Sequence, residues 1–303
     1  MSALRQNLWL AALLVFAVVA WGASNAGTKY LVGPVGWPPI WTGGTRFLCA
    51  GFLLLGWLRL NAAGRNAVPL SPAVSRALWW RGGLSLAAYI VVFNWALRLT
   101  SASHVALYLG AAPVWAVLWE GRAADARAAL LRYAAAALAL GGVVALLWPA
   151  LRQSSVSLPG EVLGLAGSVL WTSYGRQCRV LTRDLGGLEV SAHTMWRAGL
   201  LLLPLAAVEL AGTGLPGAAW DWGIQAYCVL GGGVLAYAIW SVALRRWPTS
   251  RVYLFNNLIP LSTMAWAHVT LNEPVTPTFW LAMLLIVAGV LLGQQSWRRR
   301  SSN

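Results

Sequence analysis

The sequence predicts an all-α polytopic membrane protein, with ten transmembrane helices arranged as two inverted five-helix repeats. The first observation is composition: the 303 residues are 59% hydrophobic and 10% charged, with a mean hydropathy of +0.64. A soluble domain carries about 25% charged residues, so lipid is the expected solvent. The second observation is a series of continuous apolar runs, since a helix of about 20 residues crosses the hydrocarbon core. The third is an internal repeat.

The first half contains five apolar runs, each long enough to cross a bilayer. Breakers such as Gly33-Pro34 and Pro149 lie in the connectors between the runs. We therefore expect spans at Leu8–Tyr30, Pro38–Leu60, Leu78–Leu99, Ala102–Glu120 and Ala128–Trp148.

The second half contains five further runs of the same kind. Gly186-Gly187, Pro248 and the segment Pro274 to Pro277 interrupt them. The expected spans are Pro159–Leu181, Leu188–Leu210, Trp220–Leu244, Ser250–Leu271 and Pro277–Gln294.

The basic residues set the expected orientation. The net charge is +14, and most arginines lie at one set of span ends, which becomes the inner side if the N-terminus is cytoplasmic. Only Lys29, Arg98 and Arg152 then lie outside. This positive-inside bias predicts a multi-pass membrane protein with both termini in the cytoplasm. It also explains the charge without a nucleic-acid partner.

The chain repeats itself at an offset of 147 residues. The segment 96–143 overlays 243–290 without a gap, and with slips of a few residues Arg46 pairs with Arg197. Each half, residues 1–150 and 151–303, then holds five spans, and an odd number inverts the second half. Inverted halves are the architecture of secondary transporters, whose substrate site lies between the halves near mid-membrane. A duplicated structural membrane protein with no pathway is the alternative.

The repeated unit contains Ala-Leu, a short turn with Ser or Thr, a mid-helix Pro and a closing Gly-Val helix, and the first span carries Trp21-Gly22-x-Ser24-Asn25. Over essentially the whole chain this resembles the EamA repeat of the drug/metabolite transporter superfamily. Within that superfamily it is most similar to the YddG-type aromatic amino acid exporters of bacterial inner membranes, a resemblance that implies the same membrane for this chain. One departure is that the acidic residue after the fourth and ninth helices is clear only in Asn272-Glu273. The first half has Ala124-Asp125 instead.

Candidate substrate-binding residues are aromatic or amide side chains in otherwise apolar spans, several of them at repeat-related positions. The adjacent amides at 256 and 257 are costly in lipid unless they are hydrogen-bonded or wet, so they either face a cavity or clasp a neighbouring helix. The candidates are Trp21, Asn25, Tyr89, Tyr108, Trp171, Tyr174, Tyr237, Asn256 and Asn257.

Pro113 and Pro260 are equivalent by the repeat, and we expect both to kink their helices. A proline removes one backbone hydrogen bond and frees the carbonyls of Leu109 and Asn256. In lipid such a carbonyl must accept a hydrogen bond from protein, water or a ligand. The two prolines therefore either shape a central cavity or make packing kinks that a neighbouring Ser or Thr repairs.

Arg46 and Arg197 are the only charges expected well inside a span, where each costs about 2.5 to 3.5 kcal/mol to insert. Either they bond helix carbonyls as structural clasps, or one of them meets a substrate carboxylate. Their symmetric occurrence favours the structural interpretation. His104, near a helix end, is also expected to be structural.

These features predict an alternating-access exporter of aromatic or large apolar amino acids, with membrane lipid as its other contact and a monomeric state. We expect no catalytic residue, metal or cofactor, since His-Glu-x-x-His and a buried Asp pair are absent from the sequence. Export without proton coupling is expected because every acidic residue falls at a span end or in a connector. The alternative is export of other small metabolites or lipophilic drugs by proton antiport. The acidic residues are Glu120, Asp125, Glu161, Asp184, Glu189, Glu209, Asp221 and Glu273.

Overall fold

The structure is a computed structural model, which describes residues 3–61, 70–112, 115, 119, 126–152, 157–183, 185–214, 217–247, 252 and 254–298. Within these residues the secondary structure consists of helices and turns without strands, which confirms the all-helical prediction. The first half forms α1 Ala3–Val32, α2 Pro39–Asn61, α3 Pro72–Ala77, η1 Leu78–Gly83, α4 Leu84–Leu99, α5 Ala102–Gly110 and α7 Ala126–Arg152. The second half forms α8 Leu158–Leu181, α9 Gly187–Thr213, α10 Ala219–Tyr227, η2 Cys228–Leu235, α11 Ala236–Arg246, η3 Leu254–Leu258, α13 Ile259–Leu271 and α14 Pro277–Arg298.

Five of the described helical segments are long and apolar enough to cross a membrane, so the chain is a multi-pass membrane protein. Two of them join an α-helix, a π-helix and a second α-helix into one span. The five are Arg5–Val32, Pro72–Leu99, Ala129–Pro149, Gly187–Thr213 and Ala219–Arg246.

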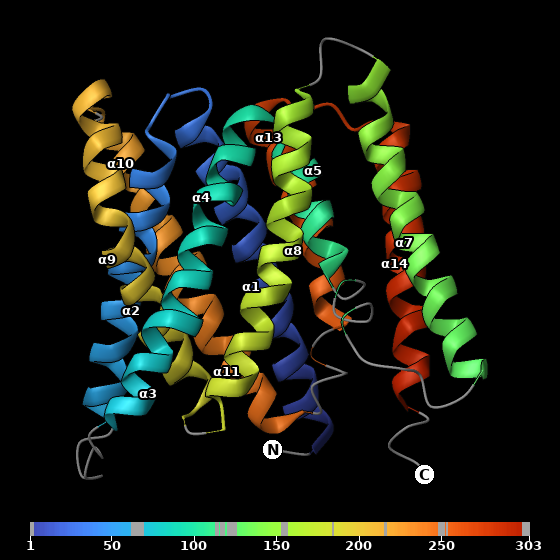
Figure 1. Ribbon diagram of the computed structural model, residues 1–303, viewed down its shortest axis with the longest axis horizontal. Coiled ribbons are helices and arrows are strands. Elements are labelled where there is room, and N and C mark those ends of the chain that lie inside the picture. Colours follow the sequence, from blue (N-terminus) through green and yellow to red (C-terminus); the bar gives the residue numbers. More distant parts are fainter. Residues whose placement is uncertain are drawn as a thin grey trace.

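The helices run lengthwise between two ends of the molecule, and α1 begins at the same end at which α14 finishes, the lower end in Figure 1. Helices from the two halves alternate in the packing. Thus α2 packs along α9, α7 along α14, α4 along α8 and α1 along α13. The core is therefore built between the halves rather than within each one.

Small residues let the helices approach closely. A Cβ on Gly199 of α9 would lie 2.6 Å from Leu48 Cβ and 2.8 Å from the Gly44 carbonyl of α2. Close approach at glycine is the usual way in which membrane helices gain van der Waals contact, because lipid supplies no hydrophobic force between them.

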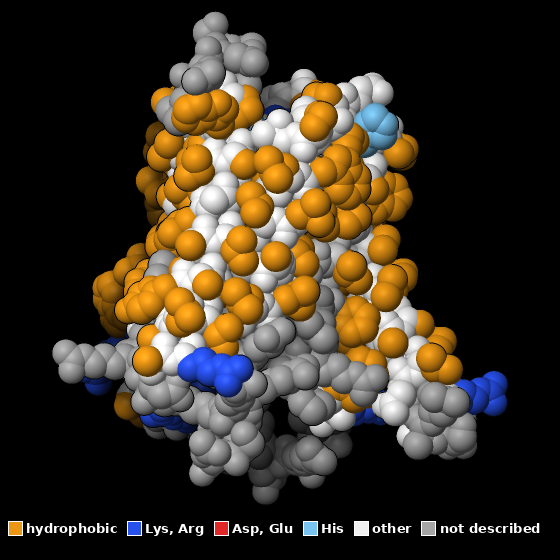
Figure 2. Space-filling model, turned by 90° about the vertical axis from the view of Figure 1, so that its right-hand side faces the viewer, with side chains coloured by type: hydrophobic (Ala, Val, Ile, Leu, Met, Phe, Trp, Pro, Cys, Tyr) orange, Lys and Arg blue, Asp and Glu red, His pale blue; other side chains and the backbone are white. Residues whose placement is uncertain are grey.

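The helix pair α7–α14 forms one side of the molecule, and Figure 2 shows this side covered with hydrophobic side chains. Leu130 and Tyr133 of α7 and Leu284 of α14 are each about two thirds exposed, at 70%, 66% and 68%. A soluble protein would bury such residues, whereas lipid solvates them.

Two expected spans differ from regular α-helices in the same way. The spans expected at Leu78–Leu99 and Trp220–Leu244 contain the π-helical segments η1 and η2. Both segments hold a Gly-Gly pair, Gly82-Gly83 and Gly232-Gly233. Glycine is a weak helix former and allows close packing, so the backbone widens there, and such π-segments are frequent at functional sites.

The span expected at Ser250–Leu271 is not one α-helix where it is described. The 3-10 helix η3 precedes α13, and Pro260 is the second residue of α13. Proline suits this position because the first N–H groups of a helix have no intrahelical partner. Pro260 therefore lies at a junction between two helix types rather than in the middle of one helix.

Candidate functional site

One aromatic cluster joins α1 to the span that contains η2. The Trp21 indole donates a hydrogen bond from Nε1 to the Gly232 carbonyl at 2.9 Å. Its ring centroid lies 5.4 Å from Tyr237, edge to face, and 5.2 Å from Trp240. The π-segment therefore presents a backbone acceptor directly to a half-buried aromatic side chain.

A second aromatic cluster joins α8 to α4. The Trp171 ring lies 4.9 Å from Tyr89 and 5.5 Å from Tyr174, and Tyr89 stacks on Phe93 at 5.2 Å. Tyr237 packs against the same buried core as Tyr89 and Tyr174, which connects the two clusters. Five of the nine expected substrate-binding residues thus meet in the interior between the halves.

The expected amides and prolines have separate positions. The Asn25 amide donates to the Thr263 hydroxyl at 3.2 Å and so ties α1 to α13. Asn256 and Asn257 are half-buried on η3, and no hydrogen bond of either to another described residue is present. Pro260 is buried against Gly110 of α5. Pro113 lies outside the described residues.

Arg46 is buried next to the first aromatic cluster. Its Nη1 donates to the Thr28 hydroxyl at 3.2 Å, and its Nε has no hydrogen-bond partner. A Cβ on Gly232 would lie 3.2 Å from Arg46 Nη2 and 2.6 Å from Ser24 Cβ. No carboxylate of the described chain pairs with this guanidinium.

Arg197, the repeat counterpart, has different surroundings. Its guanidinium lies between the rings of Trp196, at 4.3 Å, and Trp79, at 5.4 Å. Its Nη1 also donates to Nδ1 and to the carbonyl of His193, at 2.9 and 3.1 Å. Protein groups therefore cover most of this cation.

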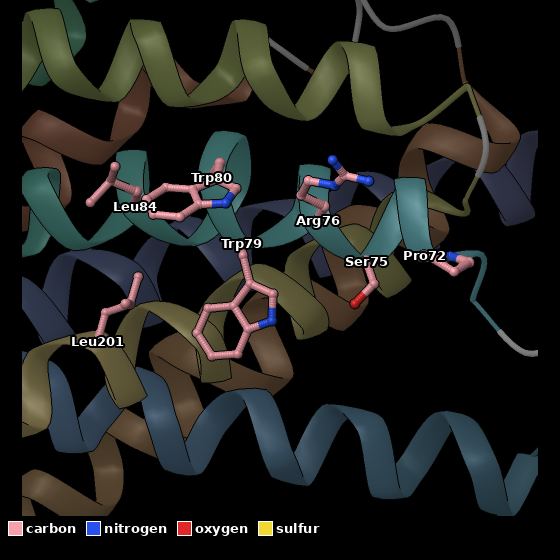
Figure 3. Close-up of a pocket in the computed structure, with 7 residues that line it drawn as sticks. All are labelled: Pro72, Ser75, Arg76, Trp79, Trp80, Leu84 and Leu201. Atoms are coloured by element: carbon pink, nitrogen blue, oxygen red, sulfur yellow. The ribbon is translucent and has the colours of Figure 1, made fainter.

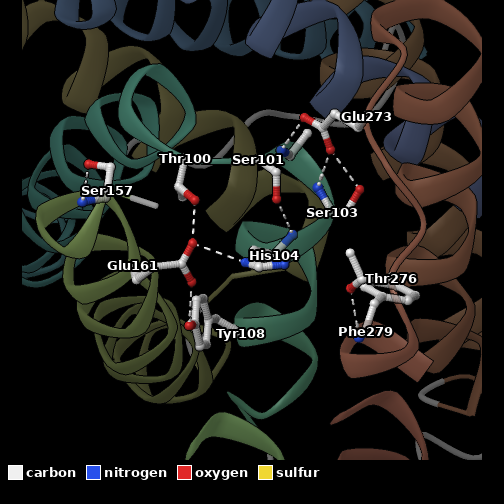
Figure 4. Close-up of polar contacts among 12 residues, drawn as sticks. Thr100, Ser101, Ser103, His104, Tyr108, Ser157, Glu161, Glu273, Thr276 and Phe279 are labelled. Carbon is white, nitrogen blue, oxygen red and sulfur yellow. Dashed lines mark hydrogen bonds and ion pairs between the residues drawn. The ribbon is translucent and has the colours of Figure 1, made fainter. Parts of the chain in front are cut away.

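Tyr108 belongs to a polar network away from the aromatic clusters. Figure 4 shows Glu161 of α8 facing Thr100, His104 and Tyr108. The Tyr108 hydroxyl donates to Glu161 Oε2 at 2.5 Å, His104 Nδ1 lies 3.0 Å from Oε1, and the Thr100 hydroxyl bonds the same oxygen. Glu161 is 0% exposed. The Glu161 carboxylate therefore joins the first turn of α8 to α5 and to the end of α4 by hydrogen bonds.

This network was missed by reading the acidic residues only as span ends. His104 and Tyr108 are four residues apart and share one helix face. That pairing, together with the segment Pro159-Gly160-Glu161, is the signal that could have indicated a partner for the carboxylate.

Two further carboxylates of the second half bind helix N-termini of the first half. Glu273 accepts from the Ala102 and Ser103 amides at 2.7 and 3.2 Å, and Glu209 accepts from the Ile40 amide at 2.7 Å. A carboxylate at a helix N-terminus satisfies unpaired N–H groups and the helix dipole. These acids join the halves at the end where α2 and α5 begin (Figure 1).

A surface groove of about 530 Å³ lies outside this interior. Figure 3 shows that α3, η1 and α4 supply most of its lining, with Leu201 from α9 on the other side. It contains none of the expected binding residues. Two tryptophans beside an arginine are typical of a membrane interface. The lining is Pro72, Ser75, Arg76, Trp79, Trp80, Leu84 and Leu201.

The described residues contain no group of three or more potential metal ligands. The described buried residues offer aromatic faces, hydroxyl and amide groups, the carboxylates of Glu161 and Asp221, and the guanidinium groups of Arg46 and Arg197. Such a set can bind and orient a small amphipathic molecule.

Comparisons with known proteins point to a transporter family. The family model described as the EamA-like transporter family matches residues 8–148 and 158–293. The inner membrane transporter YedA of Escherichia coli is 27% identical, covering 95% of this chain and 91% of its own. A probable amino-acid metabolite efflux pump of Salmonella typhimurium is 25% identical, covering 95% of both chains. A solved crystal structure has the same fold, with a TM-score of 0.62 and 19% identity, over 94% of this chain and 97% of that chain.

Proposed function

We propose a function from one premise: this chain belongs to the EamA-like transporter family and is a membrane transporter. The proposed activity is export of aromatic or large apolar amino acids by alternating access. The observation that carries it is the interior pair of aromatic clusters around Trp21 and Trp171, which come from opposite halves. Aromatic pairs prefer offset or edge-to-face contacts, and a substrate ring can replace one partner in such a contact.

The proposal includes two inverted five-helix halves, residues 1–150 and 151–303. The packing supports this division because exchanging each element for its repeat counterpart reproduces the contacts. Thus α1 packs on η2 and α11 as α8 packs on η1 and α4, and α1 packs on α13 as α8 packs on α5. The clusters then lie at the boundary between halves that move against each other.

The export proposal is tested in proteoliposomes loaded with labelled phenylalanine or tryptophan. We expect efflux down the substrate gradient, and we expect Trp21→Ala and Trp171→Ala each to slow it. Trp222→Ala, at the span end of α10, is a control aromatic outside both clusters. Unchanged efflux in both cluster variants would place the site elsewhere, and no efflux by the folded wild type would reject the cargo.

The proposed orientation has its own test. Single cysteines at Ser155 or Thr213 should react with membrane-impermeant reagents added outside cells, and cysteines at Asn66 or Ser302 should not. The opposite pattern would reverse the proposed cytoplasmic position of both termini.

Proton antiport of other metabolites or lipophilic drugs is the second candidate function. Buried Glu161 favours it, because this carboxylate joins α8 to α4 and α5 and has His104 beside it. Intramembrane carboxylates commonly take part in proton relays. An imposed pH difference should then drive uphill accumulation that Glu161→Gln abolishes, whereas facilitated export needs no pH difference.

A further inference from the structure

Arg46 is a buried cation, and among the described residues it has no carboxylate as a counter-charge. Its side chain is 6% exposed, and its one hydrogen bond is to the neutral Thr28 hydroxyl. A buried charge is expensive unless it is paired, and an unpaired one is usually neutralised. Arginine cannot be neutralised by losing its proton at physiological pH. The missing partner is therefore an anion that the described part of the chain does not supply.

The Arg46 guanidinium lies in a region where a second buried polar group also lacks a hydrogen-bond partner. Arg46 Nε and Ser24 Oγ are both buried and without a hydrogen bond. Gly232 lies between these two polar groups and the first aromatic cluster. Its Cα lies against Ser24 and Arg46, and its carbonyl accepts the hydrogen bond of the Trp21 indole. Donors for an anion and aromatic faces for a ring are thus adjacent.

The spacing suits one class of anion. Ser24 and Trp21 are three residues apart on α1, a rise of about 4.5 Å. The carboxylate and the ring of an aromatic amino acid are separated by a distance of that order. We infer that Arg46 binds the carboxylate of the transported aromatic amino acid, while Trp21 and Tyr237 contact its ring. This inference rests on the proposed export of such amino acids.

The guanidinium matches this role chemically. It can offer a carboxylate two parallel N–H donors, and hydrogen bonds between such charged groups are about twice as strong as neutral ones. Arg197 Nε also has no hydrogen-bond partner, but two indole rings cover the faces of this guanidinium and His193 occupies Nη1, so Arg197 is closed to a carboxylate. A single site with one cation fits a substrate with one carboxylate.

The test compares phenylalanine with two analogues in purified wild type and variants, by calorimetric titration. Phenethylamine lacks the carboxylate, and 3-phenylpropionate keeps it but lacks the ammonium. In the wild type we expect phenylalanine and 3-phenylpropionate to bind more tightly than phenethylamine. Arg46→Gln should weaken both carboxylates roughly 10- to 100-fold, as expected for loss of a charge-assisted hydrogen bond, and leave phenethylamine unchanged or tighter.

Two further variants keep the result interpretable. Arg46→Lys retains the charge but not the paired donors and should give an intermediate loss of affinity for the two carboxylates. This variant also keeps the test possible if Arg46→Gln does not fold. Arg197→Gln is the matched control and should keep the preference for carboxylates.

The outcomes separate the two proposals. Equal phenylalanine affinity in the wild type and both folded Arg46 variants would overturn the Arg46 assignment while leaving export intact. If the wild type binds aliphatic carboxylates in an Arg46-dependent way but no aromatic compound, the anion site stands and the aromatic cargo is rejected. If the wild type binds no carboxylate at all, both fail.

Discussion

Arg46 and Arg197 occupy equivalent places in the two halves, yet the protein treats them differently. Each lies on the second long helix of its half and packs against the π-segment of the other half. Arg197 is enclosed by Trp79 and Trp196 and bonded to His193. Arg46 has the Thr28 hydroxyl at 3.2 Å and the ring of Phe47 at 5.2 Å as its partners. An arginine repeated in the sequence can thus hold helices together in one half and keep hydrogen-bond donors without partners in the other.

The difference arises from neighbouring residues rather than from the arginines. Trp196 and His193 lie beside Arg197 on its own helix, whereas the positions with the same spacing from Arg46 hold Thr45 and Thr42. Trp79 comes from η1 in the other half. The first half therefore leaves its arginine with one hydroxyl and one ring as partners, whereas the second half surrounds its arginine with two indole rings and a histidine.

The largest expected effect is that replacing each arginine by methionine changes the free energy of unfolding in opposite directions. Arg197→Met removes two cation–π contacts and a charged hydrogen bond and should destabilise the fold by about 2 kcal/mol. Arg46→Met removes an unpaired buried charge and should be neutral or stabilising by about 1 kcal/mol. The check is thermal unfolding of both variants in one detergent. Equal destabilisation would show that Arg46 is also a structural clasp.

The next effect concerns the glycines beside the arginines. Gly232→Ala brings a methyl group onto Ser24 and Arg46, and overpacking of this kind typically costs about 1 to 3 kcal/mol. Gly83→Ala, which would approach Arg197 Cβ at 3.0 Å, should cost less. Unfolding midpoints of the two variants measure the difference.

A second substitution tests the cause. Ser24→Gly removes the atoms nearest to the new methyl group and should restore part of the stability lost in Gly232→Ala. Failure of this rescue would mean that the methyl group disturbs the π-segment itself.

The helical architecture and the interior position of five aromatic residues could be predicted from the sequence. Hydropathy and the internal repeat determine them, because lipid forces backbone groups into helices and the repeat pairs Trp21 with Trp171. The burial of Glu161 could not be predicted. Position along the helix says that the carboxylate is near an end, but only the packing of α8 on α5 shows which side chains surround it.

The π-segments were also beyond sequence analysis. Gly-Gly pairs weaken a helix, but the widening to a π-turn depends on what lies opposite, here Ser24 and Arg46 for Gly232 and Thr194 and Arg197 for Gly82-Gly83. Tyr108 shows the converse limit. The sequence predicts Tyr108 to bind substrate with the other aromatic candidates, but its hydroxyl donates to Glu161, away from the aromatic clusters.

A smaller effect tests the enclosure of Arg197 directly. Trp79→Leu should destabilise the wild type by about 1 kcal/mol through loss of one cation–π face, and it should cost less when Arg197 is already Met. A double-mutant cycle on unfolding free energies measures this coupling. Additive effects would mean that Trp79 acts through the surface groove it lines and not through the guanidinium.

The smallest effect distinguishes the two aromatic clusters beside the arginines. Trp21→Phe loses ring area and also the hydrogen bond to the Gly232 carbonyl, whereas Trp171→Phe loses ring area alone, since no hydrogen bond of its indole to a described residue is present. We expect Trp21→Phe to be the more destabilising of the two by about 0.5 to 1.5 kcal/mol, the net worth of one buried hydrogen bond. Thermal unfolding without substrate is the measurement. If the two variants unfold at the same temperature, the hydrogen bond from Trp21 to the Gly232 carbonyl adds nothing to the free energy of unfolding. The two clusters would then contribute equally to stability.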